Sequence, residues 1–146
     1  MKVERSIEIE APPERVYDLV MDPRRLADWV TIHVGLKEAP RGELREGSEL
    51  VQCLKLAGRR FDVHWEVVQA EKPRRVVWEG KGPVYSRAKV VYDFDPDGNG
   101  KTCFSYTNEY SMPGGPLGRI AASALRGTSQ RESERSLEKL KRIVEG

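Results

Sequence analysis

Six polar residues occupy strand positions whose neighbours on the same face are apolar, and these residues are the best suited to bind a ligand. They are Gln52, Ser86, Tyr92, Tyr106, Asn108 and Tyr110. A closed core rarely holds so many polar groups, because each buried one needs a hydrogen-bond partner. Polar groups that converge on an apolar cavity are instead typical of a small-molecule site. We favour this interpretation for Gln52 and Asn108, whereas the tyrosine hydroxyls could equally reach water at a sheet edge.

The apolar wall of the predicted cavity comes from the same strand faces. Its members are Leu54, Phe61, Val63, Trp65, Trp78, Val90 and Phe104. The predicted ligand-binding set is completed by residues from helical segments, namely Trp29, Ala124, Leu125 and Thr128. If the strand faces are assigned correctly, Trp65, Trp78 and Tyr106 are mostly buried, and His33 and His64 are mostly exposed.

Residues 93–98 (DFDPDG) imitate the first half of a calcium-binding loop. The twelfth position of that loop requires a glutamate and holds Phe104, and strands rather than helices flank the segment. We therefore interpret it as a hairpin turn. His33 and His64 have no third ligand close in sequence, so we predict no metal and no other cofactor.

Acid–base catalysis requires a titratable group that faces the cavity, and the inward strand positions contain no Asp, Glu, His or Lys. The one inward charge, Arg5, lies near the chain start, where its guanidinium can reach water. Cys53 and Cys103 are expected as free thiols on the opposite faces, which argues against a nucleophile. Any reaction would depend on tyrosine hydroxyls and on water held by Asn108, so catalysis stays open.

The elements that position these residues follow from the hydrophobic pattern. Strict alternation predicts a strand over residues 3–10 with one wet side. Two short helices are expected next, over 14–21 and 24–29, because prolines open each of them. From residue 32 to 110 the period stays near two, and clusters of Gly, Pro and Asp divide this region into six further strands of an antiparallel sheet.

A long helix is expected from Pro116 to Glu145, about 45 Å in length. Its apolar residues between 117 and 128 share one face, and those between 137 and 144 share another about 140° away. The phase changes at residues 127–129 (GTS), which are poor helix formers. We predict a bend there, with Thr128 or a neighbour facing the cavity opposite Asn108 or Gln52. Gly127 could also simply let a strand pass close.

Length and charge limit the classes of function. The 146 residues suffice for one domain, and 25 basic against 23 acidic residues leave a net charge of +2 with both signs interspersed. This pattern indicates neither nucleic-acid binding nor a basic face for membranes. No apolar run approaches the roughly 18 residues of a membrane span, and the chain enters a strand pattern without a signal peptide, so we expect a cytoplasmic protein.

Several stretches resemble one superfamily over the whole chain. They are residues 7–17 (IEIEAPPERVY), Trp29, Glu46-Gly47-Ser48, 72–75 (KPRR) and 137–141 (LEKLK). Together they resemble the START-like helix-grip superfamily, in its polyketide cyclase/dehydrase-type (SRPBCC) branch. The resemblance implies an α+β fold for residues 1–146 as a single domain, with a curved seven-stranded antiparallel sheet around a long C-terminal helix. It also implies a cavity between sheet and helix, covered by two short helices after the first strand.

The strand faces and the resemblance favour a protein that binds a hydrophobic or aromatic small molecule, such as a lipid, a quinone or a polyketide. The first alternative is a polyketide aromatase/cyclase or dehydratase that acts by folding its substrate. The second is a protein-interaction module similar to chaperone cofactors. The expected partner is the hydrophobic ligand, without nucleic acid or a membrane span, and a weak homodimer stays open. The fold alone does not decide among these.

Overall fold

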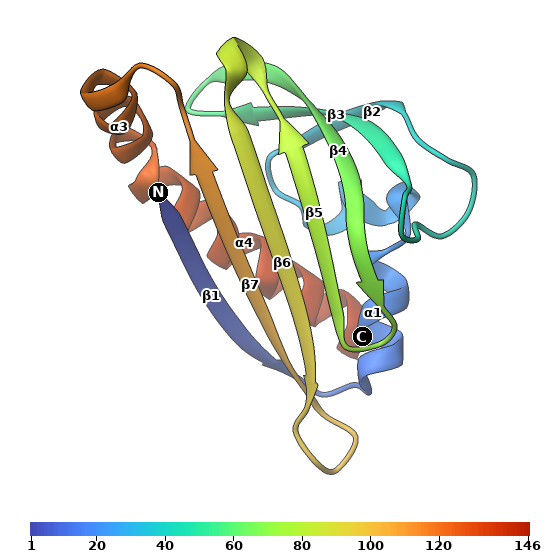
Figure 1. Ribbon diagram of the computed structural model, residues 1–146. Helices are drawn as coiled ribbons and strands as arrows, with labels where there is room; N and C mark the ends of the chain where they lie inside the picture. The colour runs from blue at the N-terminus through green and yellow to red at the C-terminus, as the bar shows by residue number, and fades with distance from the viewer.

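The computed structural model describes all 146 residues and shows a curved antiparallel sheet wrapped around a C-terminal helix (Figure 1). The strands lie in the order β1-β7-β6-β5-β4-β3-β2. Their bounds are β1 Lys2–Ile9, β2 His33–Glu38, β3 Glu49–Leu56, β4 Arg59–Glu71, β5 Arg75–Lys81, β6 Arg87–Pro96 and β7 Thr102–Ser111. The predicted fold class is confirmed.

Short helices follow β1 and precede β2, as predicted. They are α1 Pro13–Val20, the single turn η1 Pro23–Arg25, and α2 Leu26–Trp29. The Asp22 carboxylate accepts a hydrogen bond from the Arg24 backbone N–H (3.0 Å), which caps η1. The Tyr17 ring of α1 lies 5.2 Å from that of Phe94, so α1 packs on β6.

The predicted final helix consists of two helices, α3 Gly115–Ala124 and α4 Arg126–Glu145. The break falls at Leu125 and not at residues 127–129, which lie in the first turn of α4. No strand passes close to Gly127, because a Cβ there would meet only the Arg131 side chain, at 3.7 Å. The alternative prediction, that Gly127 lets a strand pass close, is therefore wrong.

The buried side of α3 is its small-residue side, contrary to the predicted apolar face. Gly118 and Ala122 are buried, whereas Leu117 and Ile120 are exposed. A Cβ at Gly118 would lie 2.4 Å from the carbonyl oxygen of Pro113, so only glycine allows this close approach. The backbone contact therefore turns the two large side chains of α3 outward.

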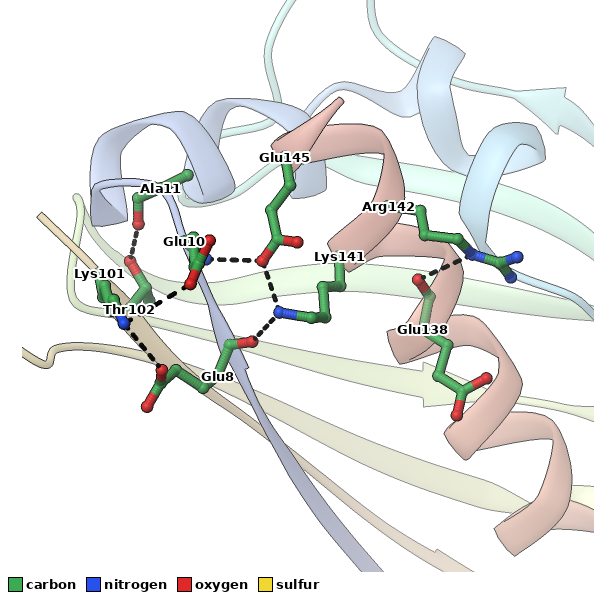
Figure 2. Close-up of polar contacts among 9 residues, drawn as sticks. All are labelled: Glu8, Glu10, Ala11, Lys101, Thr102, Glu138, Lys141, Arg142 and Glu145. Carbon is green, nitrogen blue, oxygen red and sulfur yellow. Dashed lines mark hydrogen bonds and ion pairs between the residues drawn. The ribbon is translucent and has the colours of Figure 1, made fainter.

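The C-terminal end of α4 is fixed to β1 and its surroundings by polar contacts (Figure 2). The Lys141 ammonium donates to the Glu8 carbonyl (2.8 Å), and the Glu145 carboxylate accepts from the Glu10 backbone N–H (2.8 Å). Under this end lies a core of fully buried side chains, among them Ile9, Phe94, Phe104 and Leu140. We call this region the packed end.

The structure also tests other expectations from the sequence. Residues 97–101 connect β6 and β7, and the Asp97 N–H donates to the Lys101 carbonyl (2.9 Å), which confirms the hairpin turn. Cys53 and Cys103 are free and partly buried. No helix is both long and apolar enough to cross a membrane.

Candidate functional site

A cavity of about 190 Å³ lies between the concave face of the sheet and the first half of α4. Its wall includes these residues of the predicted set: Trp29, Leu54, Phe61, Val63, Trp65, Ser86, Tyr92, Tyr106, Asn108, Tyr110 and Leu125. The cavity is partly open where the exposed residues Arg87 and Ser111 line it. We call this region, with α3 and the turn η2 Pro83–Tyr85, the open end.

The pairing of β6 with β7 places the aromatic and amide groups of the cavity. Tyr92 lies opposite Tyr106, and Val90 lies opposite Asn108. The Tyr92 ring lies 6.1 Å from that of Trp29 and 5.8 Å from that of Tyr106. Because Tyr92 is buried in the middle of the sheet, its hydroxyl does not reach water at a sheet edge.

The two central tyrosines are neutral over the physiological pH range. Burial raises the pKa of Tyr106 to about 12, although hydrogen bonding with Asn108 and Ser133 opposes the increase. Burial also raises the pKa of Tyr92 well above its usual value. Their hydroxyl groups therefore remain hydrogen-bond donors and acceptors and do not supply a base.

Two buried polar atoms in the cavity residues have no hydrogen-bond partner within the protein. They are the side-chain oxygen Oδ1 of Asn108 and the indole Nε1–H of Trp29. An unpaired buried donor or acceptor costs about 1–3 kcal/mol, so native proteins rarely leave one without a reason. Both atoms belong to residues of the cavity wall, one as an acceptor and one as a donor without a partner.

Gln52 lies behind the cavity wall and contacts it through Trp65. Its Oε1 accepts from the Trp65 indole (3.0 Å), and its Nε2 lies 2.8 Å from Nδ1 of His33. Gln52 therefore orients the Trp65 ring. The alternation of residue types along the strands does not reveal this role. Gly80, opposite Trp65, leaves room for that ring, since a Cβ there would lie 2.6 Å from Trp65 Cε3.

His33 is half-buried, and the prediction that it is mostly exposed is wrong. The physical reason is its contact with Gln52, and burial lowers the pKa of the imidazole. His64 is exposed, while Trp65 and Trp78 are buried, as predicted. Tyr106 is only partly buried as a whole residue, because its side chain borders the cavity.

The structure places the remaining predicted residues outside the cavity wall. Trp78, Val90 and Phe104 are buried in the core, with the Trp78 ring 5.9 Å from that of Tyr92. Ala124 is exposed on α3. Thr128 lies in a neighbouring surface recess beside residues 31–34 and 55–58, which shares Ile32, Leu56 and Glu132 with the cavity. The break at Leu125 shifts the phase of α4, so Ser129 contributes to the cavity in place of Thr128.

One face of α4 contributes cavity residues that the strand-based prediction missed. They are Ser129, Glu132, Ser133, Ser136 and Leu137. Their spacing of i, i+3, i+4, i+7 and i+8 is that of a single helical face, and this signal is present in the sequence. The sequence-based prediction did not include this helical face, because four of its five residues are polar. Glu132 also supplies a carboxylate, which the inward strand positions lack.

The Glu132 carboxylate is held at the side of the cavity. Its Oε2 accepts a hydrogen bond from the Thr31 hydroxyl (2.5 Å), and the Thr31 backbone N–H donates to the Ser136 hydroxyl (3.0 Å). Thr31 lies between α2 and β2, so these bonds join that connection to α4.

Several solved structures share this fold. An aromatase/cyclase, Zhui from Streptomyces sp. R1128, superposes with a TM-score of 0.78 at 15% identity, covering 99% of this chain and 93% of that one. A START superfamily protein from Mycobacterium smegmatis gives a TM-score of 0.74 at 17% identity, covering 98% of both chains. At these identities the likeness extends to the fold alone.

Similar sequences are found in Mycobacterium tuberculosis. One, named an uncharacterized protein, is 28% identical over 127 residues, and another, named a toxin, is 26% identical over 127 residues. Both alignments cover 86% of this chain and 88% of the relative. The family described as "Polyketide cyclase / dehydrase and lipid transport" matches residues 1–145. The sequence-based resemblance is thus confirmed, and the chain belongs to the polyketide cyclase/dehydrase and lipid transport family.

Proposed function

We propose that this protein binds a hydrophobic or aromatic small molecule in the cavity between the sheet and α4. The observation that carries the proposal is an apolar cavity with two wall residues, Asn108 and Trp29, that each hold an unpaired buried polar atom, Oδ1 and Nε1. A ligand that pairs with both atoms removes their desolvation cost, which the free protein must bear. Membership of a family that includes lipid transport agrees with an apolar ligand.

The size and polarity of the cavity narrow the ligand class. A cavity of about 150 Å³ accommodates benzene, so one of about 190 Å³ suits a ligand of one or two rings. Asn108 Oδ1 requires a donor such as a hydroxyl, and Trp29 Nε1–H requires an acceptor such as a carbonyl or phenolic oxygen. A phenol or hydroxyquinone supplies both, whereas an acyl chain would have to extend through the open end.

Native mass spectrometry of freshly purified protein tests the proposal, followed by thermal-shift titration with phenols, quinones and fatty acids. We expect a co-purified small molecule, or a rise in melting temperature with at least the phenolic compounds. Absence of both a bound molecule and any thermal shift contradicts the proposal.

Two substitutions on α4 locate the binding site. Ser133→Leu places a large side chain in the cavity, whereas Thr128→Leu places the same side chain in the neighbouring surface recess. We expect Ser133→Leu to weaken binding by more than about tenfold, or roughly 1.4 kcal/mol, and Thr128→Leu to leave affinity unchanged. Equal effects of the two substitutions would place the ligand elsewhere.

A second candidate function, a cyclase or dehydratase reaction, is favoured by the Glu132 carboxylate at the cavity wall. A positioned carboxylate can move protons during condensation and loss of water. Glu132→Gln should then abolish the change in product profile that the protein causes with a poly-β-ketone substrate, while ligand affinity persists. Glu138→Gln, on the exposed face of the same helix, serves as the matched control. An unchanged product profile with the unsubstituted protein excludes this candidate.

A further inference from the structure

Four large apolar side chains of the open end project into solvent. Val84 and Tyr85 of η2 are 75% and 91% exposed, and Leu117 and Ile120 of α3 are 77% and 65% exposed. We call these four residues the exposed apolar patch. Apolar side chains gathered at one end of a protein usually mark an interaction site.

The exposed apolar patch flanks the opening of the cavity. Tyr85 directly precedes Ser86 and Arg87, which line the cavity, and α3 follows Ser111 and Met112, which line it too. Arg87 pairs with Ser111 across β6 and β7, so the two segments meet. Figure 1 shows α3 and the turn between β5 and β6 at the same end of the molecule.

The backbone of η2 holds two of these side chains outward in an unfavourable conformation. Val84 has φ = 50° and Tyr85 has φ = 62°, both in the left-handed region. A β-branched residue such as valine rarely adopts this region, and strained residues of this kind concentrate at functional sites. Both side chains nevertheless remain in water, so no internal packing compensates for the strain.

The segments around the opening are also rich in cations, although Glu79 and Glu109 lie beside Arg87 and Glu132 lines the cavity. The three segments that meet around the opening, residues 55–60, 80–88 and 111–127, contain no Asp or Glu. Their cationic residues are Lys55, Arg59, Arg60, Lys81, Arg87, Arg119 and Arg126. None of these seven forms an ion pair, whereas cations elsewhere do, such as Lys72 with Asp18 and Lys141 with Glu145.

We propose that the open end docks on the surface of an anionic lipid bilayer. The exposed apolar patch then enters the interface, and the seven cations contact anionic headgroups. Three of the four side chains of the exposed apolar patch are aliphatic, which suits insertion into a bilayer better than the aromatic stacking used to bind single-stranded nucleic acid. The ligand can thereby pass between the cavity and the membrane without crossing water. Charges of both signs alternate along the chain, so the sequence indicated no such face, and folding gathers the seven cations from three separate segments.

Flotation with phospholipid vesicles tests the docking. We expect binding to phosphatidylcholine vesicles that contain about one-third phosphatidylglycerol and much weaker binding to phosphatidylcholine alone. Raising the salt from about 0.1 M to about 0.5 M should release the protein, because screening shortens the range of the attraction. No binding to the anionic vesicles at low salt overturns the proposal, as does equal binding to both compositions.

Substitutions in the exposed apolar patch test the inserted surface. The double variant Leu117→Ser/Ile120→Ser should weaken vesicle binding by more than about tenfold, because two apolar side chains no longer enter the interface. The control is Val34→Ser on β2, since Val34 is also a large apolar residue with 41% exposure. An equal loss in the control and in the double variant contradicts the proposal.

Charge substitutions complete the test. Arg119→Gln and Arg126→Gln should each weaken vesicle binding by about fivefold, whereas Arg74→Gln, an exposed unpaired cation in the β4–β5 turn, should have no effect. None of these positions lines the cavity, so titration with a cavity ligand should remain unchanged in every variant. Retention of an acidic protein or nucleic acid by the open end, without vesicle binding, overturns the proposal in favour of that partner. The vesicle assay and the ligand titration thus distinguish a failure of membrane docking from a failure of ligand binding.

Discussion

The packed end and the open end are built from the same sheet and the same helix α4, but only the packed end is close-packed. At the packed end Phe94, Phe104 and Leu140 are fully buried, and polar contacts join α4 to β1. At the open end Leu117 and Tyr85 are exposed, and a cavity remains beneath the helix. The comparison indicates that stability is concentrated at one end, which leaves the other end free to keep features that favour binding over stability.

The two halves of α4 show the same difference. Its C-terminal half buries Leu137, Leu140 and Val144, whereas the N-terminal half presents serines and Glu132 to the cavity. A continuous apolar stripe would fill the cavity with side chains. The polar first half is therefore what keeps the space open against the sheet.

The largest effect is expected from truncation at the packed end. Leu140→Ala should lower the free energy of unfolding by about 2–5 kcal/mol, because it leaves a hole in a close-packed core. Ser133→Ala, seven residues earlier on α4, should change it by no more than about 0.5 kcal/mol. Urea denaturation of both variants measures the difference. Comparable losses would show that stability is spread evenly along the helix.

An intermediate effect, on affinity rather than on stability, is expected at the cavity wall. Asn108→Leu removes an unpaired buried oxygen but also the amide that hydrogen-bonds with Tyr106, so the free energy of unfolding should change by less than about 1 kcal/mol. Affinity for a phenol should fall by about tenfold, or roughly 1.4 kcal/mol, while affinity for the same ring without its hydroxyl should not fall. Calorimetric titration with the two compounds provides the comparison. A loss of stability well above about 1 kcal/mol, or equal losses for both compounds, would show that Asn108 is structural.

The smallest effect concerns pH and the contact of His33 with Gln52. Burial lowers the pKa of His33 in the folded protein, so below its ordinary value of about 6.5 the unfolded chain binds the extra proton first. The free energy of unfolding should therefore decrease as the pH falls from about 6.5 towards the lower folded-state pKa. His33→Gln should remove this part of the pH dependence, and His64→Gln, at an exposed position, should retain it. A slope that survives His33→Gln would assign it to another group.

The sheet and most of its inward faces could be predicted from the sequence, because alternation along a strand fixes which side chains share a face. Trp65, Tyr106 and Asn108 were placed correctly on that basis. The role of Gln52 could not be predicted, since its bond to the Trp65 indole joins two strands and leaves no trace in either pattern.

The helical part of the site was less predictable. The burial of the small-residue side of α3 depends on the close approach of Gly118 to the backbone at Pro113, a contact that periodicity does not reveal. Ser133 was missed because a search for apolar residues passes over a polar helix face. The basic open end required the fold itself, because its cations come from three separate segments.

Hydrogen–deuterium exchange with and without a bound phenol tests the division between the two ends most directly. The account predicts slower exchange on binding in residues 126–137 and 82–88, which surround the cavity, and unchanged exchange in residues 138–145 and in β1. Slower exchange confined to residues 138–145 and β1, or no change around the cavity at saturating ligand, would contradict it.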